Sequence, residues 1–337
     1  MMESARRDLA RTRESAAAWQ ELRYESTNDG DDVNEVRRAK VLWALQYDRR
    51  PEDLPLLRFL AEQEALCRRN APFQGIGEQV QLAGFLLAAH GQVEDVWRQH
   101  AIKRANFDTW CGYDQEHVFA AGAEATVAHV RASDHPDRDE VLEFLLDRDV
   151  DDEDVREWLE GRREWFPNDP GDEDPLTWVQ RAKLAGEREL ARAELDRWAL
   201  GRSRDIGTLT QLRYELADLG DFAEAARTQR EALAFADGDW NRAVGWCVLA
   251  ELERQAGDHG SAWDALRECG AALGGVADWR EVGLGRDFVK ELYLLAGVAE
   301  IGLAREVFAE AQRQARDVPG LPPVVLQAAA DAAERCE

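Results

Sequence analysis

The sequence has little of what marks a secreted, membrane-spanning or zinc-binding protein. Its five cysteines are scattered without CxxC spacing, which fits reduced thiols and not a disulfide framework or a zinc knuckle. The longest apolar run, GFLLAAHG at 84–91, is far shorter than the roughly 20 residues of a membrane-spanning helix. The first residues, MMESARRDLARTRES, lack the apolar segment of a secretory signal. We therefore expect a cytoplasmic protein that does not enter a membrane.

Positive charge is also scarce. The formal net charge is −25, and only four of the 42 basic residues are lysine, which we attribute to genome-wide codon bias. An anionic surface repels phosphate, so direct binding of DNA or RNA is disfavoured. Two interpretations of the acidity stay open. It either forms a docking surface for a basic partner or reflects solubility and the source organism.

Motifs that carry catalysis or bind cofactors are missing as well. No HExxH or paired-ligand spacing is present. The acidic run 147–158 has Asp152 where a calcium-binding loop needs glycine and Trp158 where it needs glutamate. GIGEQV at 75–80 has neither the second glycine pair nor the preceding strand of a dinucleotide loop. We therefore expect no cofactor, no metal and no catalytic residue.

The sequence is instead rich in helix-forming residues. β-branched residues are sparse, and alanine, leucine, glutamate, arginine and glutamine dominate. Short punctuation separates the expected helices, which are 33–46, one starting at Pro55, 78–89, 94–106, 114–130, 137–147 and 175–200. The segment 167–175, PNDPGDEDP, cannot continue a helix. We place a boundary there, between an N-terminal helical region at 1–166 and a C-terminal region at 175–337.

Pairs of helices recur in the C-terminal region. Residues 206–239 place Leu212 and Leu216 before a Gly-Asp turn and Ala225 after it. Residues 243–276 repeat this with the motifs Trp246-x₂-Leu249-Ala250, Gly257-Asp258 and Ala262-x₃-Leu266, followed by Cys269, and a third unit holds Phe288, Leu295, Ala304, Phe308 and Ala311. The pattern resembles the tetratricopeptide repeat (TPR), a helix–turn–helix of about 34 residues, in a degenerate form without the terminal proline. Weaker echoes lie at 22–32 and 81–97.

The resemblance implies an all-α, right-handed superhelical solenoid of TPR-like hairpins. Alanines such as Ala262 would let helices approach closely, and Trp246 and most other tryptophans would be buried between helices. Such a protein binds a protein or peptide without catalysis, as an adaptor, a regulator or an inhibitor, and the oligomeric state stays unknown. In the family, the first helix of each hairpin lines the concave groove. The matching positions here are Gln81, Phe85, Gln211, Tyr214, Glu251, Arg254, Lys290 and Tyr293.

One stretch, RANFDTWCGYDQEHVF at 104–119, is rich in reactive and aromatic side chains, and five of the six histidines lie between 90 and 135. It is either a link between two helices, punctuated by Gly112, or a patch that recognises a partner. The patch would contain Trp97, His100, Lys103, Asn106, Asp108, Tyr113, Asp114 and His117. The alternative from another class is an enzyme or metal-binding protein with a site around residues 97–117. It would use His100, Asp114 and His117 as ligands, or Cys111 with His117 as a nucleophile–base pair.

Overall fold

The structure, a computed structural model, describes residues 1–27, 30–70 and 75–336. Within these residues every regular element is helical, and the only strand-like pairing is one bridge between Ser26 and Asp32. The all-α prediction is confirmed. No helix in the described part of the chain is both long enough and apolar enough to cross a bilayer.

The chain divides into two compact units. The first, here called the N-terminal unit, comprises Met1–Thr177 with Leu184–Glu187, and the second, the hairpin unit, comprises Trp178–Lys183 with Arg188–Glu337. The division falls within helix α10 (Pro175–Leu184). Residues 167–175, where the sequence suggested a boundary, belong to the N-terminal unit.

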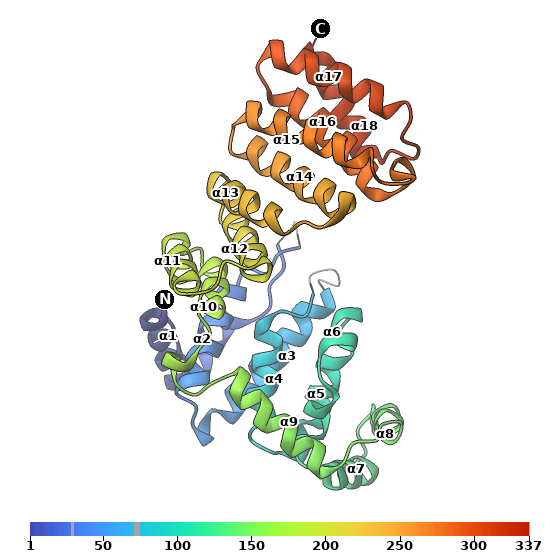
Figure 1. Cartoon of the computed structure of the whole chain (residues 1–337). Helices are drawn as coiled ribbons and strands as arrows, with labels where there is room; N and C mark the ends of the chain where they lie inside the picture. The colour runs from blue at the N-terminus through green and yellow to red at the C-terminus, as the bar shows by residue number, and fades with distance from the viewer. Residues whose placement is uncertain (28–29, 71–74, 337) are drawn as a thin grey trace. The chain divides into compact units, whose positions relative to one another are not determined.

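The N-terminal unit consists of short and medium helices joined by 3-10 turns (Figure 1). The α-helices are α1 (Met2–Glu14), α2 (Glu35–Tyr47), α3 (Leu54–Asn70), α4 (Glu78–Ala88), α5 (Val96–Lys103), α6 (Phe107–Gly112), α7 (Ala123–Ala132), α8 (Arg138–Leu146) and α9 (Asp152–Trp165). The 3-10 helices are η1 (Ala16–Leu22), η2 (Pro51–Asp53), η3 (Val93–Asp95), η4 (Gln115–Phe119) and η5 (Pro170–Asp172). The single helix predicted at 114–130 is wrong. The chain turns at 120–122, where the Gly122 N–H donates to the Phe119 carbonyl (2.8 Å), and this turn separates η4 from α7.

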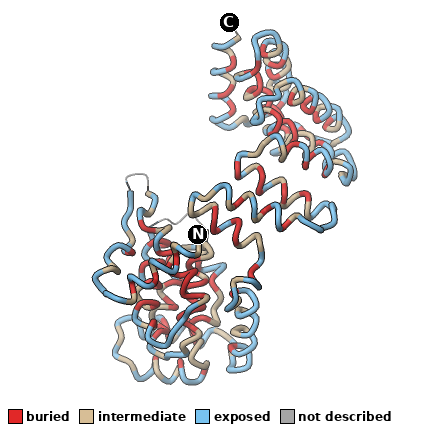
Figure 2. Tube along the Cα trace, turned by 90° about the vertical axis from the view of Figure 1, so that its left-hand side faces the viewer, coloured by how far each residue is buried: buried red, intermediate tan, exposed pale blue. Residues whose placement is uncertain are grey.

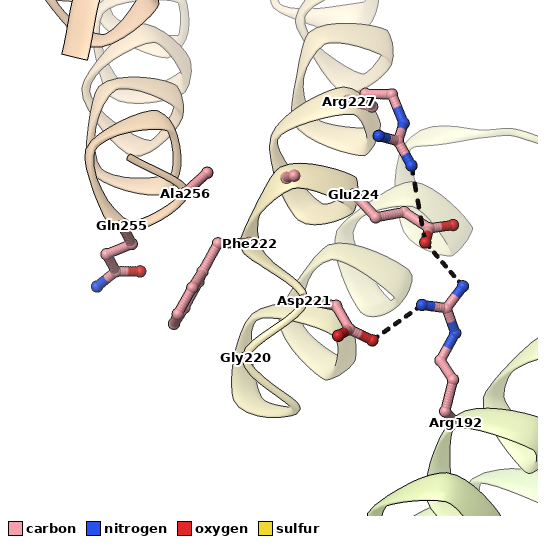
Figure 3. A pocket seen from close by; sticks show the side chains of 9 residues that line it. Arg192, Gly220, Asp221, Phe222, Glu224, Arg227, Gln255 and Ala256 are labelled. Carbon is pink, nitrogen blue, oxygen red and sulfur yellow. Dashed lines mark hydrogen bonds and ion pairs between the residues drawn. The ribbon is translucent and has the colours of Figure 1, made fainter. Parts of the chain in front are cut away.

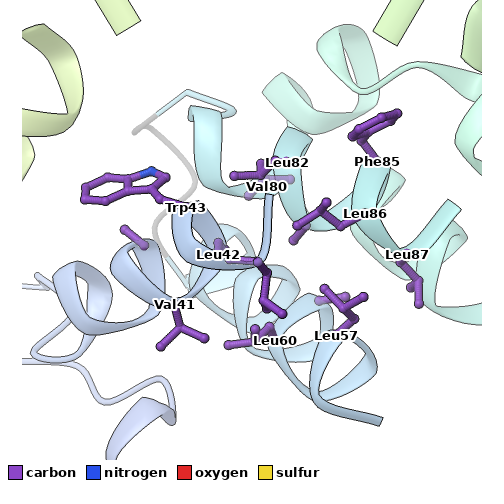
Figure 4. Close-up of a cluster of buried hydrophobic side chains, with 14 of the residues drawn as sticks. Val41, Leu42, Trp43, Leu57, Leu60, Val80, Leu82, Phe85, Leu86 and Leu87 are labelled. Atoms are coloured by element: carbon purple, nitrogen blue, oxygen red, sulfur yellow. The ribbon is translucent and has the colours of Figure 1, made fainter. Parts of the chain in front are cut away.

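A large hydrophobic cluster of the N-terminal unit is centred on α2, α3 and α4 (Figure 4), and a smaller cluster involves α5, η4, α7, α8 and α9. Helix α2 buries six consecutive residues, 41–46, which marks it as a central helix covered on all sides. Apolar side chains of α3 and α4 pack against it, including Leu57, Leu60, Val80, Leu82, Leu86 and Leu87. Charged side chains are also buried in this unit. Arg38 is fully buried and donates to Glu64 (2.8 Å) and to Asp32.

From α11 onward, the hairpin unit consists of helices that pack in pairs. They are α11 (Arg188–Ala199), α12 (Ile206–Asp218), α13 (Phe222–Ala232), α14 (Gly238–Gln255), α15 (His259–Leu273), α16 (Gly283–Val298), α17 (Ile301–Ala315) and α18 (Pro323–Cys336), with the 3-10 helices η6 (Leu233–Phe235) and η7 (Trp279–Glu281). Helices α12 and α13, α14 and α15, and α16 and α17 pack as pairs, and each second helix also contacts the first helix of the next pair. Figure 2 shows the buried residues along the lines where these helices meet.

The long helix predicted at 175–200 is wrong in one respect. The chain forms two helices, α10 and α11, because Gly186 has a φ of 73°, in the left-handed region that ends a helix. The sequence reads LAGERE here, so the glycine stands among strong helix formers. An isolated glycine inside a helical pattern is often tolerated, and for this reason the pattern alone concealed the break.

The interior of the hairpins is built from small residues. Ala225, Ala262 and Ala304 each have no exposed surface, as expected for positions where two helices approach closely. The turns repeat too, since the N–H of Asp221 donates to the Leu216 carbonyl (2.8 Å) and the N–H of Asp258 donates to the Glu253 carbonyl (2.9 Å). These bonds satisfy carbonyl groups that the helix end leaves open.

The tryptophans do not fill the gaps between helices as expected. Only Trp43, Trp178, Trp198 and Trp279 are buried among the 12, and Trp246, predicted to be buried, is half-buried. Trp246 lies beside Leu249 in the wall of a surface cavity.

Candidate functional site

The stretch 104–119 is a folded segment held against the rest of the N-terminal unit. Asn106 caps α6 by accepting a hydrogen bond from the Thr109 N–H (2.8 Å), and its amide donates to the Arg68 carbonyl (2.9 Å). Asp108 accepts from the Gly75 N–H (3.1 Å). Asn106 and Asp108 therefore fasten α6 to the region that follows α3.

Tyr113 and His117 lie in the interior. The Tyr113 hydroxyl donates to the Gln99 amide oxygen, and its ring stacks on the imidazole of His117 with centroids 4.0 Å apart. The rings of His117 and Trp158 pack edge to face, with centroids 4.4 Å apart. Gly84 makes room for this stack, since a Cβ at that position would lie 1.9 Å from the Tyr113 oxygen.

Both central histidines are neutral at physiological pH. The His117 Nδ1 lies 3.1 Å from the Asp114 carbonyl oxygen, which can only accept, so Nδ1 carries the proton. Burial lowers the pKa of His117 to about 3. His100 packs edge-on against Phe144 at 5.0 Å, and burial lowers its pKa to about 4.

Asp114 connects η4 to α9. Its carboxylate accepts from the indole N–H of Trp158 (2.7 Å) and from Arg162. Burial acts to raise the pKa of Asp114, but these two hydrogen bonds outweigh burial and lower it. The Lys103 ammonium donates to the Tyr113 carbonyl and lies 5.6 Å from the Trp110 ring centroid, and burial lowers the pKa of Lys103.

These contacts decide the hypotheses for residues 97–117. No group of three His, Cys, Asp or Glu side chains among the described residues is placed to hold a metal ion, so His100, Asp114 and His117 do not form the hypothesised metal site. The nucleophile–base pair fails too. Cys111 is exposed, the His117 Nδ1 bonds the Asp114 carbonyl and the buried His117 Nε2 has no hydrogen-bond partner.

The recognition patch loses most of its central members. His100, Lys103, Tyr113 and His117 are at most 7% exposed, which is too little for a partner to contact them. Asn106, Asp108 and Asp114 are half-buried and already engaged in the hydrogen bonds described above. Only Trp97 lines an open cavity.

Two of the eight predicted groove residues belong to the core. Phe85 packs in the α2–α3–α4 cluster (Figure 4). Its ring stacks on Phe166 with centroids 5.5 Å apart. Tyr293 is buried against Phe308 at 6.0 Å. Position matching to the repeat pattern assigned both residues to a groove, but each turns its ring toward a neighbouring helix. We therefore exclude Phe85 and Tyr293 from the surface considered below.

The remaining groove candidates lie at or near the surface. Tyr214 is exposed, with the Arg213 guanidinium 4.1 Å from its ring centroid, and Glu251 is exposed on α14. Gln81, Gln211, Arg254 and Lys290 are half-buried. Gln211 donates to Glu215 (2.7 Å), Lys290 pairs with Asp287 (3.4 Å) and Arg254 pairs with Glu291 of the adjacent helix (2.5 Å).

Sequence reasoning identified Tyr214 but missed the other large apolar side chains that are exposed on these first helices. Large side chains on the first helices of three successive hairpins are between 37% and 61% exposed, and they are Tyr214, Trp240, Val244 and Val298. Trp240 and Val244 are one helical turn apart on α14, and half-buried Val248 follows at the same spacing. This i, i+4 spacing of apolar residues could have indicated the exposed stripe from the sequence. Helix α14 has another apolar stripe that packs in the hairpin, so the additional one was available for the surface.

A cavity of about 440 Å³ lies beside the turn between α12 and α13 (Figure 3). Arg192 of α11 projects there and donates to Asp221 (2.9 Å) and Glu224 (2.7 Å). Arg227 lies on the other side of Glu224, at 3.7 Å. The charged side chains beside this cavity are therefore paired with one another.

Comparison with protein-family models, with curated proteins and with solved structures finds no match for this chain.

Proposed function

We propose that this protein binds a protein or peptide through its hairpin unit and acts as a non-catalytic adaptor, regulator or inhibitor. In this proposal α12 to α17 form a right-handed superhelical solenoid of TPR-like hairpins. The observation that supports it is the exposure of Tyr214, Trp240, Val244 and Val298 on the first helices of consecutive hairpins.

Exposed side chains of this size are the type on which protein interfaces depend. Tyrosine and tryptophan are enriched among the residues that contribute most to binding, and each buries a large area when a partner covers it. Polar groups lie beside the apolar ones on the same helices. Glu251 of α14 is close enough to Glu291 of α16 for its charge to reinforce the raised pKa that burial gives Glu291. A mixture of apolar centres and charged borders suits a peptide better than a buried metabolite.

The test is a selection of peptides that bind the full chain, followed by measurement with variants. Val244→Asp places a charge within the apolar stripe, and Ala271→Asp places the same charge on an exposed position of α15 as the matched control. We expect selected peptides to bind the wild type and the control equally and to bind the Val244 variant at least about tenfold more weakly. Failure to enrich any peptide, or equal binding to both variants, would contradict the proposal.

A further inference from the structure

A second cavity, of about 590 Å³, lies in the N-terminal unit between α3 and α5. It is formed by Glu62, Gln63, Ala65, Leu66 and Arg69 of α3, by Glu94 of η3, by Trp97, Arg98 and Ala101 of α5, and by His135 and Asp137 of the loop before α8. Its volume is in the range of sites that hold small ligands or a few residues of a peptide. None of these residues has a role in the proposed function of the hairpin unit.

The two helices that border the cavity run in the same direction. Arg58 pairs with Asp95 (2.7 Å), and one turn further along both helices Glu62 pairs with Arg98 (2.8 Å). The cavity is bordered by α3 from Glu62 to Arg69, about two turns or 10 Å, and by α5 from Trp97 to Ala101, about one turn. Because the helices are parallel, each end of the cavity receives residues from matching positions of α3 and α5.

The middle of the cavity is apolar and firmly built. Ala65, Leu66 and Ala101 lie there together with Trp97, whose indole stacks on His135 at 4.0 Å and an interplanar angle of 10°. The His135 ring is oriented by the backbone N–H of Asp137, which donates to its Nδ1 (3.2 Å). A wall held by stacking and a hydrogen bond loses little conformational freedom when a ligand arrives.

The two ends of the cavity carry opposite charge. Glu62 and Arg98 neutralise each other by their ion pair. Glu94 and Asp137 remain at the end where α5 begins, and neither has an arginine or lysine partner among the residues that the structure describes. Arg69 remains at the other end, exposed and without a carboxylate partner in the described ranges. The cavity is therefore dipolar, with an apolar middle.

We propose that this cavity binds a short extended segment of a partner protein in which a lysine or arginine and an acidic residue are three positions apart, with large apolar side chains between them. Three residue steps of extended chain span about 10 Å, the length of α3 from Glu62 to Arg69 that borders the cavity. The cation would lie against Glu94 and Asp137, the carboxylate against Arg69, and the apolar side chains against Trp97 and Leu66. The inference concerns the N-terminal unit and is independent of the proposed role of the hairpin unit.

The probe is the peptide acetyl-Lys-Phe-Leu-Glu-amide carrying a fluorophore, titrated with the full chain and followed by anisotropy. Its blocked ends leave only the side-chain charges. We expect saturable binding of this probe, and binding about tenfold weaker or more for two control peptides. One control replaces Phe-Leu by Ser-Ser, and the other replaces the glutamate by lysine. Absence of saturable binding of the probe, or equal binding of all three peptides, overturns the proposal.

Charge reversal in the protein distinguishes this cavity from other surfaces. Arg69→Glu should weaken binding of the probe by about tenfold and should strengthen binding of the control peptide that ends in lysine. Arg131→Glu makes the same change at an exposed position of α7 and should alter neither peptide. Circular dichroism confirms that both variants fold. If the Arg69 variant keeps the preference of the wild type for the probe, the proposed orientation and site are overturned.

Discussion

The two units hold their helices together by different means. In the hairpin unit, alanines recur where helices cross, and each helix pair repeats the contacts of the one before it. In the N-terminal unit, large leucines pack around α2 and its Trp43, and the buried Arg38 is paired with Glu64 of another helix. The first arrangement depends on backbones that approach closely, and the second depends on individual side chains that fit one another. The units therefore respond differently to mutation.

The largest expected effect lies in the hairpin unit. Ala262→Arg would place a long cation where no surface is exposed and no carboxylate is arranged to receive it. An uncompensated buried charge costs about 3–5 kcal/mol of unfolding free energy. The control Ala271→Arg, on the exposed side of the same helix, should change that free energy by no more than about 0.5 kcal/mol. Denaturant unfolding measures both, and equal stability of the two variants would show that the small residues do not set the helix spacing.

In the N-terminal unit, the corresponding test adds a single methyl group at Gly84. Gly84→Ala would place a Cβ 1.9 Å from the Tyr113 oxygen and 2.7 Å from its Cζ, in a ring that is buried and cannot move freely. Overpacking of this kind costs about 1–3 kcal/mol. Gly161→Ala on α9 meets no atom within 4 Å and should instead stabilise by about 0.5–1 kcal/mol through helix propensity. Thermal or denaturant unfolding that gave both variants the same sign would contradict the packing described for Tyr113.

The buried histidine makes the stability of the N-terminal unit dependent on pH. Burial depresses the folded-state pKa of His117 from 6.5 to about 3. As the pH falls below 6.5 the unfolded chain binds a proton that the folded chain does not, so stability present at neutral pH is lost progressively down to about pH 3. Between about pH 7 and pH 4.5 this loss amounts to roughly 2 kcal/mol.

His117→Phe keeps an aromatic ring on Tyr113 and removes the titrating group. We expect the difference in unfolding free energy between about pH 7 and pH 4.5 to be smaller in the variant by that amount of roughly 2 kcal/mol. Carboxylates titrate in both proteins and cancel in the comparison. An unchanged pH dependence would mean that solvent reaches the imidazole.

The smallest expected effect on stability belongs to the exposed face of the hairpins. Tyr214→Ala removes a ring that is mostly in solvent, apart from its contact with Arg213, and should change the unfolding free energy by no more than about 0.5 kcal/mol. Peptides selected on the wild type should bind this variant about tenfold more weakly. Unchanged binding would remove Tyr214 from the proposed surface and confine the interaction to α14 and α16.

The pattern of the hairpin unit could be predicted from sequence because its signals are local. The Gly-Asp turns after Leu219 and Ala256 and the alanines that follow them lie within one helix pair, and the structure buries Ala225, Ala262 and Ala304 as expected. Local patterns do not reveal which side of a helix faces a neighbour once a second apolar stripe is present. That is why Val244 was missed and Tyr293 was assigned to a groove.

The segment around Tyr113 could not be predicted for a different reason. Its fold depends on contacts between residues distant in the chain, such as Asp114 with Trp158 and Tyr113 against Gly84. A sequence that places His100, Asp114 and His117 close together suggests a site, but it does not show that Phe144 and Trp158 cover the two imidazoles. The sequence therefore left both interpretations open, a link between helices and a recognition patch, whereas most of these polar residues support the interior.

The burial of Lys103 has a kinetic consequence. Its ammonium is enclosed, with the Tyr113 carbonyl as acceptor, and burial lowers its pKa, so the amine would be nucleophilic if a reagent could reach it. We therefore expect an acylating reagent to modify Lys103 only when α5 separates from α6 and Tyr113. The chain has just three other lysines, so mass spectrometry can follow this single position with little interference. The rate of Lys103 acylation therefore measures how often the N-terminal unit opens locally in the native protein.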